Sequence, residues 1–63
     1  MSELERYVTE KTVSELTNIP CSTLRKHRFF GEGMPYYKVN KTVRYLLRDV
    51  HDFMASRRIQ PRR

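Results

Sequence analysis

The sequence has little of what membrane, exported or disulfide-bonded proteins require. No apolar run approaches the roughly 20 residues that span a bilayer, and no apolar signal-peptide segment follows Met1. Cys21 is the single cysteine of the chain, so no second thiol exists for an internal disulfide. We therefore expect a cytoplasmic protein without a membrane partner.

The residue groupings that support catalysis or metal binding are also missing. No CxxC or HxxxH spacing connects the candidate ligands, which are Cys21, His27, Asp49, His51 and Asp52. A nucleophilic Cys21 would need a base and an oxyanion site, and a domain this small has little room for a pocket. We expect no metal, no cofactor and no enzymatic activity.

What the sequence has instead is positive charge, concentrated in its middle. The formal net charge is +6. Residues 21–48 carry seven Lys or Arg against one Glu, whereas residues 1–20 carry two against four. This distribution favours a polyanionic partner, and nucleic acid before a membrane, because no basic helix with a broad apolar face is present.

A chain of 63 residues predicts a single domain, residues 1–63, with a thin core. Residues 1–7 have no periodic pattern and are expected to form a leader. Residues 59–63 are expected to form a basic, flexible tail.

Two short helices are predicted in the first half of the domain. Thr9 is a suitable N-cap for a helix that ends at Asn18, a residue that tolerates the left-handed conformation. A second helix is predicted from Cys21 to about Phe30, because Pro20 suits a helix start and Gly31 a helix end. So short a connection is typical of a helix-turn-helix. The residues expected to be buried between the helices are Val13, Leu16, Ile19 and Leu24.

A β-hairpin is predicted next, because Tyr and Val alternate with polar residues in MPYYKVNKTVRYL. A loop of residues 40–42 would pair Val39 with Val43 and separate an apolar face from a wet face that carries Lys38 and Arg44. A two-residue loop would pair Val39 with Thr42 and mix the faces. We prefer the three-residue loop on this ground.

A third helix is predicted from Asp49 to about Arg58. Val50, Phe53 and Met54 recur at helical spacing and are expected to face the core. The fold class is therefore mainly α, with three short helices and a small two-stranded hairpin.

The second helix and the hairpin are predicted to present cations and hydroxyls outward. With Leu24 turned inward, Arg25 and Lys26 lie on the opposite side of the helix, which fits the major groove of B-DNA. A basic ribbon beside such a helix can reach the adjacent minor groove or its phosphates. The alternative for the helix is a solvated charged face, and the alternative for the hairpin is that its charged edge residues only discourage strand aggregation. The candidate DNA-binding residues are Ser22, Thr23, Arg25, Lys26 and Arg28 on the helix and Lys38, Asn40, Lys41, Thr42 and Arg44 on the hairpin.

From Tyr7 to Met54 the chain resembles the small MerR-like winged helix-turn-helix proteins of the excisionase and AlpA type. The segments that carry the resemblance are, in order, VTEKTVSELTNI, STLR, GEGMP, YKVNKTVRY and RDVHDFM. The resemblance implies sequence-specific binding of double-stranded DNA, with the second helix in the major groove and the hairpin as a wing at the minor groove. It implies an excisionase (recombination directionality factor) or an AlpA-like transcriptional regulator of a phage or integrated element, associated with the nucleoid.

The chain stops short of the C-terminal coiled coil of full MerR regulators. We therefore expect a monomer in solution that acts with neighbouring copies on DNA or with an integrase or recombinase. A second hypothesis is a protein-assembly adapter, in which Phe29, Phe30 and the basic tail dock onto a recombinase or terminase partner.

Overall fold

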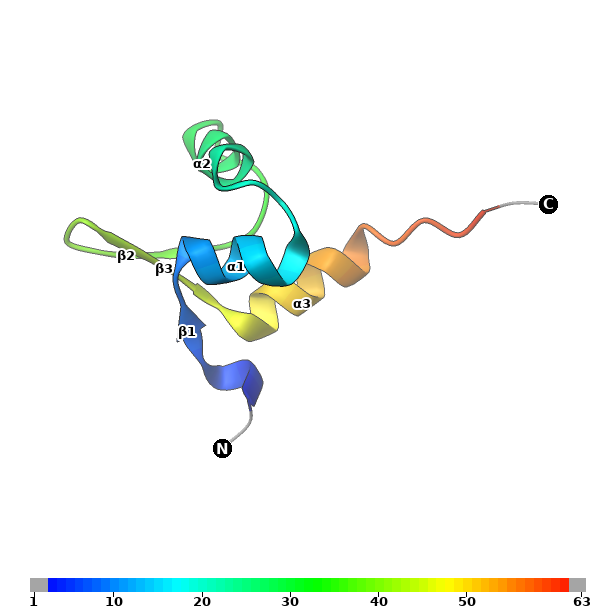
Figure 1. Cartoon of the computed structure of the whole chain (residues 1–63), viewed down its shortest axis with the longest axis horizontal. Coiled ribbons are helices and arrows are strands. Elements are labelled where there is room, and N and C mark those ends of the chain that lie inside the picture. The colour runs from blue at the N-terminus through cyan, green and yellow to red at the C-terminus, as the bar shows by residue number, and fades with distance from the viewer. Residues whose placement is uncertain (1–2, 62–63) are drawn as a thin grey trace.

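The computed structural model describes residues 3–61, and in this range the fold is α+β, with three α-helices and a three-stranded antiparallel sheet. The elements are the 3-10 turn η1 (Glu3–Glu5), β1 (Tyr7–Val8), α1 (Glu10–Thr17), α2 (Cys21–Phe29), β2 (Tyr37–Val39), β3 (Thr42–Leu46) and α3 (Leu47–Ser56). The hairpin of β2 and β3 and the helix α3 extend in opposite directions from the centre of the molecule, and α2 lies above α1 in the view of Figure 1.

The capping residues of α1 are those that the sequence predicts. The side chain of Thr9 accepts a hydrogen bond of 3.2 Å from the backbone N–H of Thr12, which satisfies one unpaired donor of the first turn. Asn18 ends the helix in the left-handed conformation, with φ 60°, and its N–H donates to the carbonyl of Ser14. The helix α2 begins after Pro20 as predicted and ends one residue before the predicted Phe30.

The prediction that the leader extends to residue 7 is wrong, because Tyr7 and Val8 form a strand. Tyr7 pairs with Leu46 and Val8 with Tyr45, so β1 covers one edge of β3 while β2 covers the other. A strand of two residues is too short to leave a periodic pattern in the sequence, and it forms because the edge of β3 offers unpaired backbone groups. Residues 1–2 of the leader lie outside the described residues.

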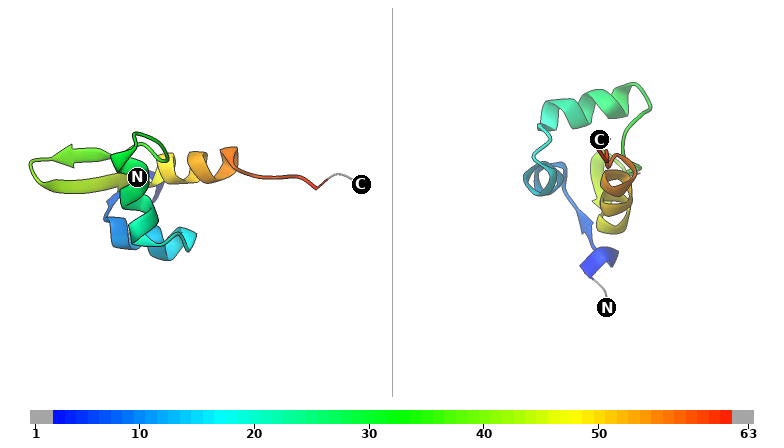
Figure 2. Two further views of the ribbon diagram at one scale, coloured as in Figure 1. Left: turned by 90° about the horizontal axis from the view of Figure 1, so that it is seen from above. Right: turned by 90° about the vertical axis from the view of Figure 1, so that its right-hand side faces the viewer.

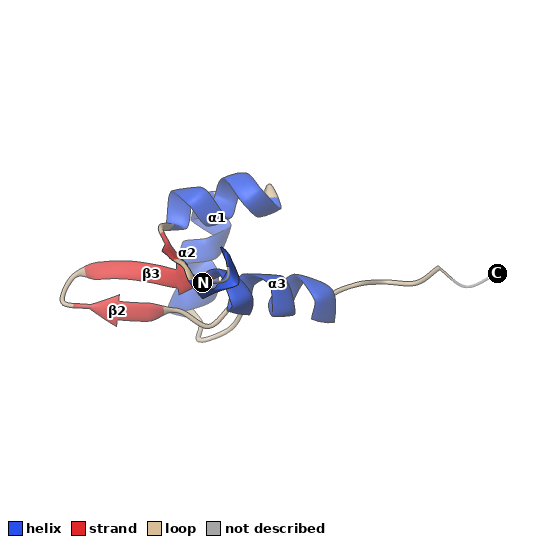
Figure 3. Ribbon diagram, turned by 90° about the horizontal axis from the view of Figure 1, so that it is seen from below, coloured by secondary structure: helices blue, strands red, loops and turns tan. Residues whose placement is uncertain are grey.

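The predicted register of the hairpin is also wrong. Val39 pairs with Thr42 and Lys38 with Val43, so the turn contains two residues, Asn40 and Lys41. Asn40 has φ 57°, the conformation that two-residue turns matched to the strand twist require. Val39 is 62% exposed, so no buried face exists at the hairpin tip to enforce the apolar pairing. The hairpin projects away from the helices (Figure 3).

The core lies between the three helices and the inner face of the sheet. Leu16, predicted to be buried, is 61% exposed, because α1 turns Val13 inward and leaves Leu16 at a shallow hollow between α1 and α3. Ile19 packs at the periphery of the core as a partly buried residue. The buried residues are Val8, Val13, Leu24, Met34, Tyr45, Leu47 and Val50.

The helix α3 begins at Leu47, two residues before the predicted start, because β3 continues into it without a loop and Leu47 is buried. Val50 is buried and Phe53 partly buried, as expected, but Met54 is 40% exposed. Beyond Ser56 the chain leaves the body of the protein, as two further views show (Figure 2). Arg62 and Arg63 of the predicted tail lie outside the described residues.

Candidate nucleic-acid interface

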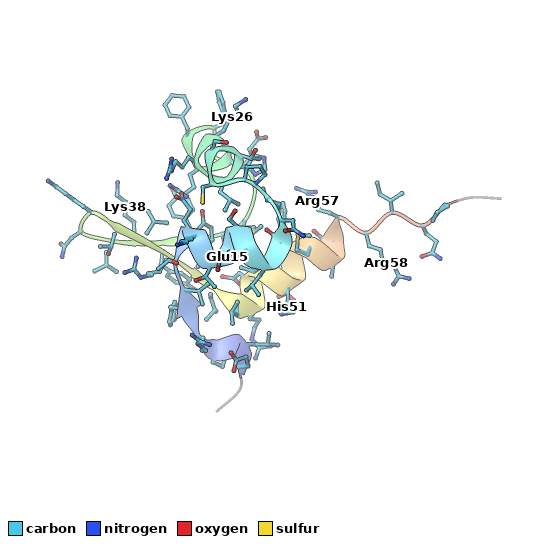
Figure 4. All side chains as sticks on the ribbon, viewed as in Figure 1. Glu15, Lys26, Lys38, His51, Arg57 and Arg58 are labelled. Atoms are coloured by element: carbon cyan, nitrogen blue, oxygen red, sulfur yellow. The ribbon has the colours of Figure 1, made fainter. Side chains whose placement is uncertain are left out.

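The outer side of α2 carries the exposed polar residues of this helix. Leu24 is 2% exposed and fixes the rotation of α2, so that Ser22, Arg25 and Lys26 face solvent and Thr23 is partly exposed. Figure 4 shows Lys26 on the side of α2 that faces away from α1. This side of the helix therefore has the composition expected of a surface that contacts phosphates and base edges.

A hollow of about 380 Å³ opens between the start of α1, one flank of α2 and the first residues of β3 with the preceding turn. We call this hollow the basic groove. Its lining residues are Thr9, Glu10, Lys11, Arg25, Arg28, Lys41, Thr42, Val43 and Arg44. The groove thus brings predicted residues of the helix and of the hairpin to one place. The other predicted residues, which are Ser22, Thr23, Lys26, Lys38 and Asn40, do not line it.

Three lining residues belong to α1 and its cap and were not predicted as site residues. Thr9, Glu10 and Lys11 reach the groove because the first turn of α1 lies against α2 and β3. In the sequence, Thr9 and Glu10 indicate only a helix start, and Lys11 is an isolated cation in an acidic segment. Only the tertiary packing shows that they face the same space as Arg25 and Arg44.

Glu10 is held between two arginines of α2. Its Oε2 accepts from Nε of Arg25 at 3.0 Å and lies 2.9 Å from Nη2 of the same guanidinium. Its Oε1 lies 2.9 Å from Nη1 of Arg28. The side chains of Glu10 and Arg28 are 18% and 19% exposed, whereas that of Arg25 is 65% exposed. Arg25 is therefore the member of this cluster that an external ligand can reach.

The charges in the cluster stabilise one another. Burial raises the pKa of Glu10, but the close contacts with the guanidinium groups of Arg28 and Arg25 outweigh burial, and the pKa is lowered from its usual value. Burial lowers the pKa of Arg28, but the hydrogen bond to Tyr45 and the ion pair with Glu10 outweigh it, and the pKa is raised. Glu10 and Arg28 are therefore both ionised at neutral pH.

Arg28 is directed inward, although the sequence analysis names it as a candidate DNA-binding residue. Its Nη1 donates to the hydroxyl of Tyr45 at 2.6 Å, and its guanidinium carbon lies 5.7 Å from the centroid of the Tyr36 ring. Together with the contact to Glu10, these interactions link α2 to β3 and to α1. Arg28 therefore fixes the position of α2 relative to the hairpin, with little of its surface left for a ligand.

The observed register separates two hairpin cations that were predicted to share a face. Arg44 lies opposite Tyr37, whereas Lys38 lies opposite Val43 on the other side of the ribbon. Arg44 and the turn residue Lys41 line the basic groove, and Lys38 does not. The prediction that Lys38 and Arg44 project together is wrong, because it depended on the three-residue loop.

The C-terminal end of α2 exposes two aromatic rings. Phe29 is 83% and Phe30 64% exposed, and their rings meet edge to face with centroids 5.1 Å apart. Packing in the hydrophobic core does not explain these two residues, because both side chains lie outside the buried cluster.

Within residues 3–61, no three His, Cys, Asp or Glu side chains gather as metal ligands would, and no helix is long and apolar enough to cross a bilayer. Comparison with protein-family models, with curated proteins and with solved structures finds no match to this chain. The resemblance to MerR-like proteins therefore stays a prediction from the sequence.

Proposed function

We propose that this protein is a sequence-specific module for binding double-stranded DNA, with α1 and α2 acting as a helix-turn-helix and the β2–β3 hairpin as its wing. The observation that carries the proposal is the basic groove, where cations from α1, α2 and the hairpin line one hollow beside the exposed side of α2. The sequence resemblance supports a finer role as an excisionase or AlpA-like regulator.

In this proposal α2 enters the major groove. Arg25 is the residue for base recognition, because an arginine can donate two parallel hydrogen bonds to O6 and N7 of a guanine. Ser22, Thr23 and Lys26 are placed for phosphates or base edges near the start and outer side of the helix. These contacts need only the exposed atoms of α2.

The hairpin supplies the second part of the interface. Lys41 and Arg44 are attracted to the phosphates that border the flanking minor groove, where the negative potential is concentrated. Asn40 and Thr42 at the hairpin tip add small polar groups. Such contacts position the module on the duplex and make its affinity depend on salt.

The experiment has two stages. Genomic fragments retained by the protein are sequenced to obtain a preferred duplex, and affinity for this duplex and for a random duplex is measured over a range of salt. Arg25→Ala is expected to lower the affinity for the preferred duplex by about tenfold or more and the affinity for the random duplex by less, since a bidentate base contact contributes roughly 1–3 kcal/mol of discrimination. Arg44→Ala is expected to lower the affinity for both duplexes and to reduce the slope of log affinity against log salt concentration by about one.

Arg58→Ala is the control, because Arg58 lies beyond α3, far from the hairpin (Figure 4). It is expected to bind both duplexes much as the parent does. If Arg25→Ala and Arg44→Ala also bind the preferred duplex as tightly as the parent, the proposal is wrong.

The exposed pair of Phe29 and Phe30 favours a second candidate, an adapter that docks onto an acidic recombinase or terminase partner. Aromatic rings that remain exposed in the free protein are common anchors of protein interfaces. In this case Phe29→Ala would abolish co-purification with the partner, and Arg25→Ala would leave it intact. Loss of duplex binding in Phe29→Ala with no change in partner binding would contradict the adapter.

A further inference from the structure

A carboxylate lies at the centre of the proposed DNA-binding surface. Glu10 is the acidic member of the groove lining, among Lys11, Arg25, Arg28, Lys41 and Arg44. A negative charge at this place weakens the attraction of the groove for phosphates, which is the main source of non-specific affinity. Its presence therefore calls for a function other than general attraction to DNA.

The geometry of the pair with Arg25 points to that function. Oε2 of Glu10 takes the Nε and Nη2 side of the Arg25 guanidinium, at 3.0 Å and 2.9 Å. A guanidinium has five N–H groups in a rigid plane, so Glu10 leaves the edge formed by Nη1 and Nη2 unused. That edge carries the parallel pair of donors that matches O6 and N7 of guanine.

Glu10 is itself fixed by the interior of the protein. Its other oxygen contacts Arg28, which donates to the hydroxyl of Tyr45, and Tyr45 is 1% exposed. A continuous series of contacts thus runs from Tyr45 in β3 to Arg28 in α2. It continues through Glu10 in α1 to the exposed Arg25. The orientation of Arg25 is set by the fold, and its rotamer freedom is reduced before any ligand arrives.

We propose that Glu10 is a specificity-determining residue, which orients Arg25 for base recognition and reduces its attraction to phosphates. The inference deepens the proposed function and depends on it. Glu10 acts through Arg25 and is a positioning residue with no contact of its own to a base. Removing its charge should raise affinity for random DNA and lower the preference for the correct sequence.

The test uses Glu10→Gln, which keeps the size of the side chain and removes its charge, on the full chain. Compared with the parent, we expect Glu10→Gln to bind a random duplex several-fold more tightly, with a salt slope steeper by up to about one. We expect the ratio of preferred to random affinity to fall by about tenfold, because the bidentate contact of Arg25 is no longer oriented. Glu15→Gln, an exposed change on the same helix, is the control for net charge and should leave the ratio unchanged.

A double-mutant cycle separates this role from a merely structural one. If Glu10 acts through Arg25, Glu10→Gln has no effect on the ratio when Arg25 is already Ala. If Glu10→Gln does not fold, Glu10→Asp provides a second test, because the shorter side chain keeps the negative charge but cannot hold Arg25 and Arg28 in the same geometry. The ratio of preferred to random affinity should fall in that variant as well.

The outcomes also distinguish the two proposals. A parent protein with no preference for any duplex over random DNA contradicts the proposed function. A parent with a clear preference that Glu10→Gln retains in full, with an unchanged salt slope, overturns the role of Glu10 and leaves the DNA-binding function intact.

Discussion

The hydroxyl of Tyr45 in β3 accepts a hydrogen bond of 2.6 Å from Nη1 of Arg28 in α2. The two residues are 17 positions apart in the sequence. Because Arg28 also contacts Glu10 of α1, this bond contributes to the placement of both helices relative to the hairpin. The surface proposed to bind DNA is formed by these same three elements, so its shape depends on a mostly buried polar contact.

Replacing Tyr45 by Phe is expected to lower the free energy of unfolding by roughly 1–3 kcal/mol, because a charged donor at Arg28 loses its acceptor in a poorly hydrated place. The measurement is denaturant unfolding followed by circular dichroism. Tyr37→Phe is the matched control, since Tyr37 is on the neighbouring strand and 42% exposed. Equal stability of the two variants would show that the hydrogen bond between Tyr45 and Arg28 contributes nothing to the free energy of unfolding.

The two arginines that contact Glu10 are expected to differ in what they stabilise. Arg28→Met should lower the free energy of unfolding by roughly 1–3 kcal/mol, because it leaves a mostly buried carboxylate without one of its partners. Arg25→Met should change it by less than about 1 kcal/mol, because exposed ion pairs contribute little. Denaturant unfolding measures both. A loss at Arg25 as large as that at Arg28 would contradict this division between binding and stability.

The first two helices of the fold, α1 and α2, could be predicted because their signals are local. Thr9 and Asn18 cap α1 through groups within four residues of themselves, so the sequence alone predicts both ends. The start of α2 after Pro20 follows from the same kind of evidence. Such interactions need no knowledge of the rest of the chain.

The sheet could not be predicted in the same way. The rule that apolar side chains pair on one face applies where a face is buried, and the tip of the hairpin has none, so the turn preference of Asn40 decides the register. The strand at Tyr7 exists only because Leu46 offers a free edge. Both depend on the environment of the residues rather than on their pattern.

The candidate site could be predicted by residue type but not by orientation. Arg25 and Arg28 are both basic residues of one helix and both candidate DNA-binding residues, yet the side chain of one is 65% exposed and that of the other 19%. The difference arises from Tyr45 and Glu10, which lie in other elements. A helical projection of α2 does not contain these contacts.

The stability of the protein is expected to depend on the ionisation of Glu10. Its pKa in the folded protein is lowered from the usual 4.5, because the close contacts with the guanidinium groups of Arg28 and Arg25 outweigh the opposing effect of burial. The unfolded state therefore takes up a proton more readily than the folded state as the pH falls. The stabilisation from this residue is fully present above the unfolded pKa and is lost as the pH falls through the folded pKa.

Glu10→Gln should remove this contribution. The difference in unfolding free energy between parent and variant should be largest near about pH 7 and shrink toward about pH 3. Denaturant unfolding at both pH values measures it, with Glu15→Gln as a control on the exposed side of α1. A difference that stays constant between the two pH values would show that the pairing of Glu10 does not stabilise the fold.

The two glycines between α2 and the hairpin offer a matched pair of substitutions. Both have positive φ, 69° at Gly31 and 85° at Gly33, so alanine is strained at each. A Cβ at Gly31 would have no heavy atom within 4 Å, whereas a Cβ at Gly33 would lie 2.7 Å from Cβ and Nδ1 of His27. Gly31→Ala should therefore lower the free energy of unfolding by about 1–2 kcal/mol, from the strained backbone conformation alone. Gly33→Ala should lower it by more.

The additional cost at Gly33 can be assigned by shortening the residue that it contacts. In the His27→Ala background the imidazole is absent, although the Cβ at 2.7 Å remains, so part of the penalty of Gly33→Ala should be relieved. The penalty of Gly31→Ala should not change in that background. Thermal unfolding of the single and double variants measures both differences. Equal penalties at the two glycines would mean that the loop shifts away from His27, and that the close packing of Gly33 does not determine how α2 is connected to the hairpin.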